Sequence, residues 1–298
     1  MIDVPKPLSA SEVCAFVEQG FVTVPNLVTA EEVDEMRADT IRLARGEYPC
    51  KEIPPAPPGS TDADVLSTVL CIHQPHFVSP VMEKYVRHPA VCGVLSQVTA
   101  AHLPWWDGSV KCMQSMLFVK PPQFQGQAWH QDEIYIPTRD RSLIGAWIAL
   151  DDATVENGCL WVIPGSNKTG YLYPQHNHGQ PDEFDTGQQS YGFDTSNETP
   201  VEVKAGTVVF FNGYLLHRSA RNRSSIYRRV LVNHYCNAWS LLPWSIAEGE
   251  SVASADRRCV VPVAGSDPYA WKGYVPAPDS VWLRTCKTRD ELVAGSGS

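Results

Sequence analysis

The feature that most constrains the fold is a series of short apolar runs that begins after Trp105. The runs are rich in β-branched and aromatic residues, and Gly, Pro, Asn and Asp separate them; in chain order they read SMLFVK, LIGAWIAL, CLWVIP, GTVVFFN and RRVLVNHYC. Short strands at this spacing, with turn residues between them, are typical of an antiparallel barrel or a double-sheet jelly roll. We therefore expect a mainly β protein with a jelly-roll core over about residues 105–240.

Helices are predicted to flank this core on its N-terminal side. Ser9 with Glu12 and Thr29 with Glu32 have the spacing of capping boxes, and apolar residues at helical spacing follow each pair. Gly20 is predicted to end the first helix, and the segment FVTVPNL after it is predicted to be a short strand. These signals predict two amphipathic helices near the N-terminus.

The chain of 298 residues is long enough for one large domain, and no internal repeat is visible. We expect a single domain over 1–298, with a helical N-terminal part at about 9–102, a jelly-roll core at about 105–240 and a C-terminal extension at 241–298. Within the N-terminal part, residues 79–102 are predicted to be helical again after a Pro-rich loop. Residues 171–200 are polar and aperiodic, which predicts a long functional or mobile loop such as an active-site lid.

Composition narrows the partners and the compartment. A net charge of −9 disfavours nucleic acid, whose binding depends on cations that neutralise phosphates. No apolar run is long enough to span a membrane, and no secretory signal or peroxisomal Ser-Lys-Leu address is recognised. The nine cysteines are odd in number and never spaced as CxxC, which is typical of a reduced protein. We expect a cytoplasmic monomer or homodimer.

A candidate metal site lies in the stretch GQAWHQDEIYIP. On a strand, residues two apart share a face, so His130 and Asp132 can converge on one ion. Two histidines and one carboxylate are the ligand set of non-haem Fe(II) oxygenases, because three coordination positions stay open. The third ligand has four candidates, which are His176, His178, His217 and His234. We favour His217, which follows an apolar strand and a turn, whereas His234 can be a hydrogen-bonding partner on a strand.

Together these segments resemble the phytanoyl-CoA dioxygenase family of Fe(II)/2-oxoglutarate-dependent oxygenases. The similarity is close over about residues 113–237 and looser over 10–45, and it rests on motifs in family order: MLFVKPP, WHQDEIYIP, LIGAWIALDDATVENGCLWVIPGSNKTG and LLHRSARNRSSIYRR. The resemblance implies a double-stranded β-helix core of the jelly-roll or cupin-like type. It also implies Fe(II) as cofactor, with 2-oxoglutarate and O2 as co-substrates.

By this resemblance, His130, Asp132 and His217 are the catalytic iron ligands. Arg228, eleven residues after His217, is then the cation that holds the far carboxylate of 2-oxoglutarate, because a guanidinium pairs a carboxylate with two hydrogen bonds. Further residues implied to bind the co-substrate or to lie beside it are Ser219, Met116, Trp147 and Gln131. Neighbouring residues are expected to lie elsewhere: Arg229 and Glu133 face away, and Arg221 and Arg223 are loop cations. The basic residue that some relatives supply ahead of the barrel is not evident.

The resemblance implies hydroxylation, or a related oxidation, of a small-molecule metabolite, with release of succinate and CO2. Related halogenases have a small residue where this chain has Asp132, so the carboxylate favours hydroxylation. The substrate is expected to be a natural product or secondary metabolite. The candidates for substrate contact, chosen by position, are Tyr135, Arg139, Arg141, Trp239 and the 171–200 segment. Three alternatives stay open: an acyl-CoA α-hydroxylase, a cupin-like metal isomerase or hydrolase, and a non-catalytic binding relative.

Overall fold

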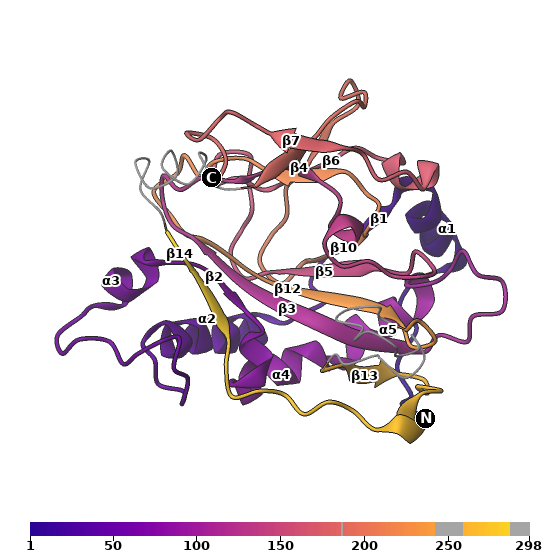
Figure 1. Ribbon diagram of the computed structural model, residues 1–298, viewed down its shortest axis with the longest axis horizontal. Helices are drawn as coiled ribbons and strands as arrows, with labels where there is room; N and C mark the ends of the chain where they lie inside the picture. The colour runs from indigo at the N-terminus through magenta and orange to yellow at the C-terminus, as the bar shows by residue number, and fades with distance from the viewer. Residues whose placement is uncertain (186, 242–258, 287–298) are drawn as a thin grey trace, which may run out of the picture.

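A large antiparallel sheet lies at the centre of the computed structural model, which describes residues 1–185, 187–241 and 259–286 (Figure 1). Within these residues its strands follow the order β1-β10-β5-β12-β3-β2-β14, and β13 also pairs with β3. Their bounds are β1 Phe21–Val24, β2 Val69–His73, β3 Val110–Lys120, β5 Ile144–Ala149, β10 Val208–Asn212, β12 Arg228–Asn237, β13 Val261–Ala264 and β14 Trp282–Thr285. The long central strands β3 and β12 pair along most of their length, so this major sheet provides a continuous floor.

A smaller antiparallel sheet faces the major sheet. Its strands follow the order β4-β11-β6-β9, with the bounds β4 Gln127–His130, β6 Leu160–Val162, β9 Thr199–Val201 and β11 His217–Ser219. A two-stranded hairpin of β7 Gln175–Asn177 and β8 Gln188–Ser190 lies beside it (Figure 1). Apolar residues from both sheets, among them Trp147, Phe211 and Leu160, pack in one buried cluster. The two sheets therefore enclose the functional core of a jelly roll, as the strand pattern predicted.

Helices cover the other face of the major sheet (Figure 1). The α-helices are α1 Ala10–Gln19, α2 Ala30–Ala44, α3 Asp62–Ser67, α4 Pro80–Val86 and α5 Pro89–Val98, and the short 3₁₀ helices are η1 Pro75–Phe77, η2 Asp132–Ile134, η3 Ser166–Thr169 and η4 Ala270–Lys272. Met36, Tyr85 and Leu95 from these helices pack with Leu117 and Phe210 of the sheet in the main hydrophobic core. Burying such side chains stabilises the fold by roughly 1.5–3 kcal/mol each. The helices thus pack against the face of the major sheet that is opposite the site.

Both predicted capping boxes are present. The hydroxyls of Ser9 and Thr29 accept from the amides of Glu12 and Glu32, and each glutamate carboxylate accepts from the cap amide in return. Gly20 ends α1 with a φ of 82°, a left-handed conformation that glycine adopts without strain. The expected strand follows as β1.

Three local predictions were wrong. Residues 69–73 form a strand of the major sheet, although the N-terminal part was expected to be helical beyond its first short strand. Residues 171–200 are not one long loop, because β7, β8 and the first two residues of β9 lie within them. The strand that carries His130 ends at that residue, and Asp132 opens η2 instead of continuing the strand. β2 and β9 pair with strands that are distant in the chain, a relation that the local pattern does not show, whereas β7 pairs with β8 in a hairpin.

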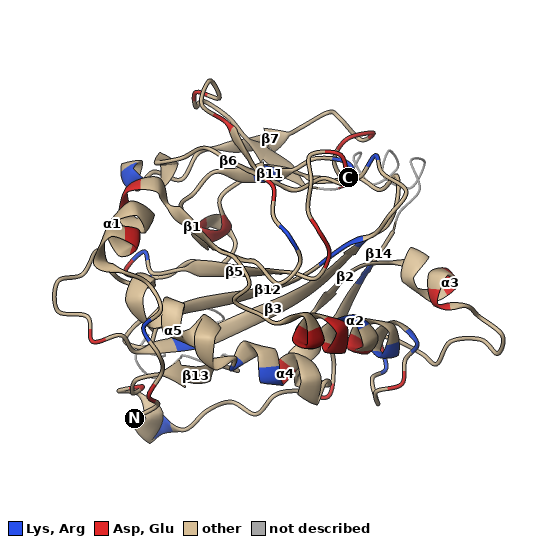
Figure 2. Cartoon of the chain, turned by 180° about the vertical axis from the view of Figure 1, so that it is seen from behind, with Lys and Arg blue, Asp and Glu red and all other residues tan. Residues whose placement is uncertain are grey.

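The C-terminal extension also contributes to the sheet. β13 pairs with β3, and β14 pairs with β2 at the edge of the major sheet. The rest of the extension, residues 242–258 and 287–298, lies outside the described residues. Asp and Glu residues are concentrated on α2, in keeping with the acidic net charge (Figure 2). Across the described ranges, no helix combines the length and apolarity that crossing a bilayer requires.

Candidate metal centre and anion site

Three side chains with metal-ligating atoms meet between the two sheets. His130 ends β4, Asp132 follows in η2, and His217 opens the neighbouring strand β11, where it pairs in register with His130. All three are buried, and one ligand atom from each lies within 4.8 Å of the others. Oδ1 of Asp132 is 3.5 Å from Nε2 of His130 and 3.6 Å from Nε2 of His217. The arrangement brings together the three residues that the sequence indicated.

The hydrogen bonds of the two imidazoles fix which nitrogen is available. Nδ1 of His130 lies 2.8 Å from the carbonyl oxygen of Ala128, and Nδ1 of His217 lies 3.0 Å from that of Leu215. Because a carbonyl oxygen only accepts, each Nδ1 carries the proton and each Nε2 presents a lone pair. Two lone pairs and the carboxylate of Asp132 then face one another without a proton between them. A divalent cation satisfies such a donor set.

The pKa values favour the same protonation states. Burial and the neighbouring His130 lower the pKa of His217 to about 4, so its ring is neutral at neutral pH. Burial acts to raise the pKa of Asp132, but the surrounding imidazoles outweigh it and hold that pKa well below its ordinary value. A neutral imidazole and an ionised carboxylate are the forms that bind metal.

His234 holds the other oxygen of Asp132. It lies on β12 of the major sheet, and its Nε2 is 3.0 Å from Oδ2 of Asp132, whereas the candidate ligand atom is Oδ1. Groups that bond to a metal ligand in this way fix its orientation. His234, one of the four histidines considered from the sequence, is therefore a partner of the candidate ligand Asp132. The sequence contains a signal for the position of His234: side chains alternate along a strand, so residues 228, 230, 232 and 234 share one face of β12.

The two remaining histidine candidates lie away from the cluster. His176 is exposed on β7, where its ring contacts Tyr191 and its Nδ1 bonds to the carbonyl of Asn177. His178 follows on the same segment, and its Nδ1 accepts from the amide of Gln180. Neither belongs to the group formed by His130, Asp132 and His217.

Arg228 is a buried cation that lacks a carboxylate partner among the described residues. It is only 4% exposed, its Nε has no hydrogen bond, and its guanidinium lies 5.5 Å from the ring centroid of Trp147. Burial lowers the pKa of Arg228 to about 10, so it stays charged at neutral pH. The adjacent Arg229 pairs instead with Asp151 at 2.8 Å, on the other face as expected. A buried charge without a partner is costly, and an anion bound beside Arg228 removes that cost.

Two further polar groups surround this position. Lys120, on β3, pairs in register with Arg228, and its Nζ donates to the carbonyl of Ala220 at 2.5 Å and to Oγ of Ser219 at 3.3 Å. Oγ of Ser219 also accepts from the amide of Gln127 at 3.3 Å, so its own proton remains available to a further acceptor. Burial, with Arg228 nearby, holds the pKa of Lys120 well below its ordinary value.

Lys120 was not singled out from the sequence. It shares a face of β3 with Met116, four residues earlier, and this period-two relation was the available signal. Two basic side chains placed opposite each other across a strand pair repel when both are charged, which agrees with the lowered pKa of Lys120. Together with the Ser219 hydroxyl, they form a candidate anion site.

These groups line one cavity of about 820 Å³ between the sheets. Met116 and Trp147 both line it, as do the three ligand-type residues, Ser219 and Arg228. Its size is in the range typical of small-molecule sites. Gln131 serves a different purpose: its amide donates to the carbonyls of Tyr171 and Tyr214 and accepts from the amide of Tyr173. Gln131 therefore joins the segment of Tyr171 and Tyr173 to that of Tyr214, beside the candidate metal cluster.

The residues suggested for substrate contact divide into two groups. Tyr135 lines the cavity, half exposed at its mouth. Arg139, Arg141 and Trp239 are not among the lining residues, and the guanidinium of Arg141 lies over the ring of Tyr214. Glu133 turns away from the ligands, because its Oε1 accepts from the amide and hydroxyl of Thr138.

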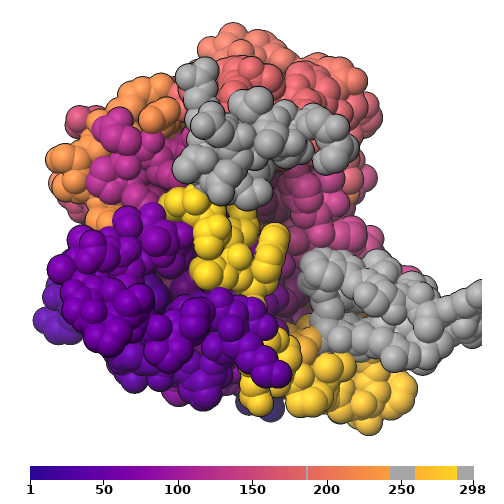
Figure 3. Space-filling model, turned by 60° about the vertical axis from the view of Figure 1, so that its left-hand side comes forward, coloured from indigo at the N-terminus to yellow at the C-terminus, as the bar shows by residue number. Residues whose placement is uncertain are grey.

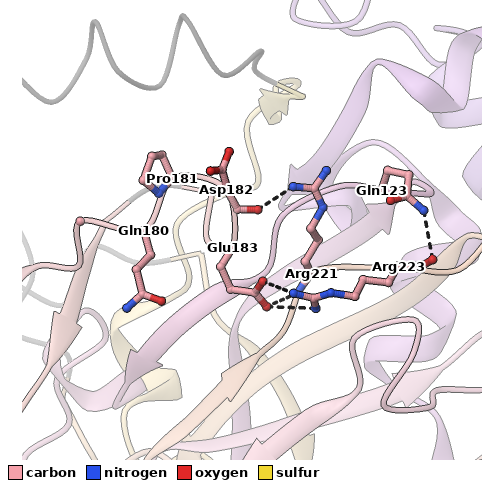
Figure 4. A pocket seen from close by; sticks show the side chains of 8 residues that line it. Gln123, Gln180, Pro181, Asp182, Glu183, Arg221 and Arg223 are labelled. Carbon is pink, nitrogen blue, oxygen red and sulfur yellow. Dashed lines mark hydrogen bonds and ion pairs between the residues drawn. The ribbon is translucent and has the colours of Figure 1, made fainter.

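A second hollow opens on the surface beside residues 179–183 (Figure 4). Arg223 pairs there with Glu183 at 2.5 Å, and Arg221 donates to the carbonyl of Asp182 at 2.7 Å. Both arginines are loop cations, as predicted, and their charges are used within the protein. The hollow offers no metal-ligating cluster among the described residues.

Comparison with known proteins gives a consistent family relationship. A family model described as "Phytanoyl-CoA dioxygenase (PhyH)" matches residues 16–230. "Phytanoyl-CoA dioxygenase 1" of Oryza sativa subsp. japonica is 33% identical over 177 residues, which cover 58% of this chain and 60% of the relative. The peroxisomal phytanoyl-CoA dioxygenase of Rattus norvegicus is 30% identical over 239 residues, covering 74% and 66%. The alignments thus span three fifths to two thirds of these relatives' length.

Solved structures share the fold at low sequence identity. The α-ketoglutarate-dependent carbocyclase SnoK from nogalamycin biosynthesis superposes with a TM-score of 0.58 and 22% identity, over 84% of this chain and 92% of that one. EctD from S. alaskensis, solved with 2-oxoglutarate and 5-hydroxyectoine, gives a TM-score of 0.58 and 21% identity, over 82% of each chain. Both likenesses concern the architecture of two facing sheets.

Proposed function

Because the chain belongs to the phytanoyl-CoA dioxygenase family, we propose that it is a non-haem Fe(II)/2-oxoglutarate-dependent dioxygenase that oxidises a small-molecule metabolite. One observation carries the proposal: a two-histidine, one-carboxylate cluster and a buried arginine without a carboxylate partner among the described residues line the same cavity. The cluster suits a divalent metal with open coordination positions, and the arginine suits a dicarboxylic co-substrate.

His130, Asp132 and His217 would hold the iron through Nε2, Oδ1 and Nε2. The iron supplies the redox chemistry that couples O2 and the conversion of 2-oxoglutarate to succinate and CO2 to oxidation of a substrate C–H bond. The protein's part is to keep both imidazoles in the Nδ1–H tautomer through the carbonyls of Ala128 and Leu215. His234 holds Asp132 so that Oδ1 points to the two Nε2 atoms.

Arg228 and Ser219 would bind the distal carboxylate of 2-oxoglutarate. The guanidinium offers a planar pair of N–H donors, and the hydroxyl of Ser219 has its proton available because two other groups already donate to its oxygen. Trp147, under the guanidinium, limits where Arg228 can move. Met116 would lie along the co-substrate, and Gln131 would act indirectly by fixing the loops beside the metal.

We further propose hydroxylation, or a related oxidation, as the outcome, because Asp132 fills the position that halide takes in related halogenases. The substrate would be a natural product or other secondary metabolite. The acidic net charge and the reduced cysteine pattern favour a cytoplasmic enzyme, a monomer or homodimer, that does not bind nucleic acid or membranes.

An acyl-CoA α-hydroxylase is the second candidate, because the curated relatives are named phytanoyl-CoA dioxygenases. A metal isomerase or hydrolase of the cupin-like type would use the cluster but not Arg228. A non-catalytic relative would need neither. Both oxygenase candidates would consume 2-oxoglutarate, whereas the isomerase or hydrolase and the non-catalytic relative would not.

The test is succinate release from 2-oxoglutarate by the full chain with Fe(II) and O2, in the presence of a metabolite library that includes acyl-CoA esters. We expect slow release without a substrate and faster release with the correct one. Asp132→Ala should abolish release, whereas Arg221→Ala, which changes a loop cation outside the cavity, should not. Absence of release with every compound, or equal release by Asp132→Ala, would contradict the proposal.

A further inference from the structure

A row of side chains crosses the floor of the cavity from the anion site to its mouth. Trp147 pairs in register with Val232, Val232 with Met116, Met116 with His73, and His73 with Trp282. Residues paired in this way share a face of the sheet, and all five line the cavity. Four steps between strands, at about 4.8 Å each, place Trp147 and Trp282 roughly 19 Å apart. The floor is therefore long enough for a second molecule beyond the co-substrate.

The outer end of this row is aromatic and exposed. Trp282 on the edge strand β14 is 62% exposed, and Tyr135, which lines the same cavity, is 50% exposed. The ring of Trp282 lies 4.2 Å from that of His73, tilted by 32°. The C-terminal segment that carries β14 forms part of the molecular surface next to the N-terminal region (Figure 3). An exposed tryptophan that lines a cavity offers a large apolar face to a ligand bound there.

The cations that line the cavity are already engaged, apart from Arg228. Arg284 on β14 pairs with Asp185 at 2.5 Å, across the mouth. Arg218 pairs with Glu198 at 3.2 Å and stacks on Trp129 and Trp161. Lys120 donates to a backbone carbonyl and to Ser219. Within the described part of the chain, the outer cavity thus has no cation left for the phosphates of an acyl-CoA.

Neutral polar groups complete the lining. Gln74, Gln114 and Gln188 contribute amides, which bond to hydroxyl or carbonyl groups and do not select a charge. Burial, with Arg284 nearby, lowers the pKa of His73 to about 3, so the ring beneath Trp282 is neutral. The outer cavity combines aromatic faces with neutral hydrogen-bonding groups.

We propose that the substrate is an uncharged molecule with a flat apolar ring system, and that it lies along this row with Trp282 as its specificity-determining contact at the mouth. The inference rests on the proposed function, because it names the substrate class of the same site. Stacking of aromatic rings, at about 0.5–1.5 kcal/mol beyond the area buried, favours a ring over an acyl chain. Recognition by Trp282 and Tyr135 needs no charge on the ligand.

The test uses N-phenyl-1-naphthylamine, an uncharged aromatic probe whose fluorescence rises in apolar sites, with the full chain in the presence of Mn(II) and 2-oxoglutarate. We expect saturable binding that weakens at least ~10-fold in Trp282→Ala and by less in Trp282→Phe. Trp271→Ala is the matched control, because Trp271 is a 79% exposed tryptophan of the same C-terminal segment outside the cavity. It should bind the probe as the wild type does.

Octanoyl-CoA serves as the competitor and should displace the probe poorly. Circular dichroism shows whether each variant is folded. If Trp282→Ala does not fold, the probe affinity of Trp282→Phe serves as the test. Equal probe affinity in the wild type and a folded Trp282 variant, or tight displacement by octanoyl-CoA, would overturn the substrate class. Probe binding does not depend on turnover, so failure of the oxygenase proposal would instead appear as absent succinate release.

Discussion

Nε2 of His234 lies 3.0 Å from Oδ2 of Asp132, and this contact joins the major sheet to the candidate metal cluster. His234 comes from β12, whereas His130 and His217 come from the smaller sheet. The carboxylate therefore has one oxygen held by the major sheet and the other directed at the two imidazoles. The geometry of the cluster depends on how the two sheets pack.

His234→Ala should weaken metal binding without removing a ligand. Loss of a partner that orients a ligand costs roughly 10–100-fold in metal affinity. Titration with Mn(II), followed by calorimetry, measures this directly, and His234→Gln should recover part of the affinity through its amide donor. His176→Ala, on an exposed strand, is the control. Unchanged Mn(II) affinity in His234→Ala would remove the orienting role.

Arg228→Ala should weaken 2-oxoglutarate binding by roughly 100-fold, because a bidentate contact between charged groups is lost, at about 1.5–3 kcal/mol for each hydrogen bond. The affinity of Arg228→Lys for 2-oxoglutarate should lie between those of the wild type and Arg228→Ala, because lysine retains the charge but not the planar fork of the guanidinium. The dissociation constant of 2-oxoglutarate, measured anaerobically, reports the change. If Arg228→Ala binds the co-substrate as the wild type does, the anion site lies elsewhere.

Ser219→Ala should raise the KM for 2-oxoglutarate by roughly tenfold and change kcat little, because one hydrogen bond to a charged group is lost. Steady-state succinate release at varied 2-oxoglutarate separates the two constants. Ser196→Ala, whose hydroxyl bonds to Asp194 on an exposed segment, should leave both constants unchanged. A fall in kcat alone would assign Ser219 to a different step.

The stability of the fold should decrease on acidification because of His76. Burial lowers the pKa of His76 to about 4, and its Nδ1 bonds to Ser115 at 2.5 Å. The unfolded chain, with a histidine pKa near 6.5, binds more protons than the folded chain below that pH. The stabilisation is therefore complete above pH 6.5 and is lost as the pH falls from 6.5 towards 4.

Urea unfolding at pH 7.5 and pH 5 measures this effect. The wild type should lose up to about 2 kcal/mol through His76 between these conditions, since each pKa unit corresponds to about 1.4 kcal/mol. His76→Gln should lose less on the same change, even if it is less stable at pH 7.5. His102→Gln, at an exposed histidine, is the control. Parallel losses in the wild type and His76→Gln would exclude His76 as the source.

How much the sequence predicts depends on whether the signal is local. The capping boxes at Ser9 and Thr29 specify α1 and α2, and short β-branched and aromatic runs between turn residues specify β5, β10 and β12. Strand β2, Val69–His73, was not predicted, because it follows directly after a short helix and pairs with β3 and β14, contacts that its own sequence does not show. Strands β13 and β14 were not predicted either, because the strands with which they pair, β3 and β2, lie far from them in the chain.

The candidate site shows the same division. The residues His130, Asp132, His217 and Arg228 could be named because motif order placed them, although Asp132 reaches the cluster from a 3₁₀ helix and not from a strand. The place of Lys120 opposite Arg228 depends on the register of β3 and β12, and the role of His234 depends on its contact with Asp132 from another part of the fold. Trp282, about 150 residues from Asp132 in the chain, has no local signal that connects it to the cavity.

The central claim is that the cluster and Arg228 bind Fe(II) and 2-oxoglutarate together. Addition of 2-oxoglutarate to the anaerobic Fe(II)-loaded chain tests it most directly, by the weak visible charge-transfer absorption of an Fe(II)-chelated keto acid. We expect a saturable band in the wild type, no band in Asp132→Ala, and a band in Arg228→Ala only at much higher 2-oxoglutarate. A wild-type chain that binds Fe(II) yet shows no band at saturating 2-oxoglutarate would contradict the account.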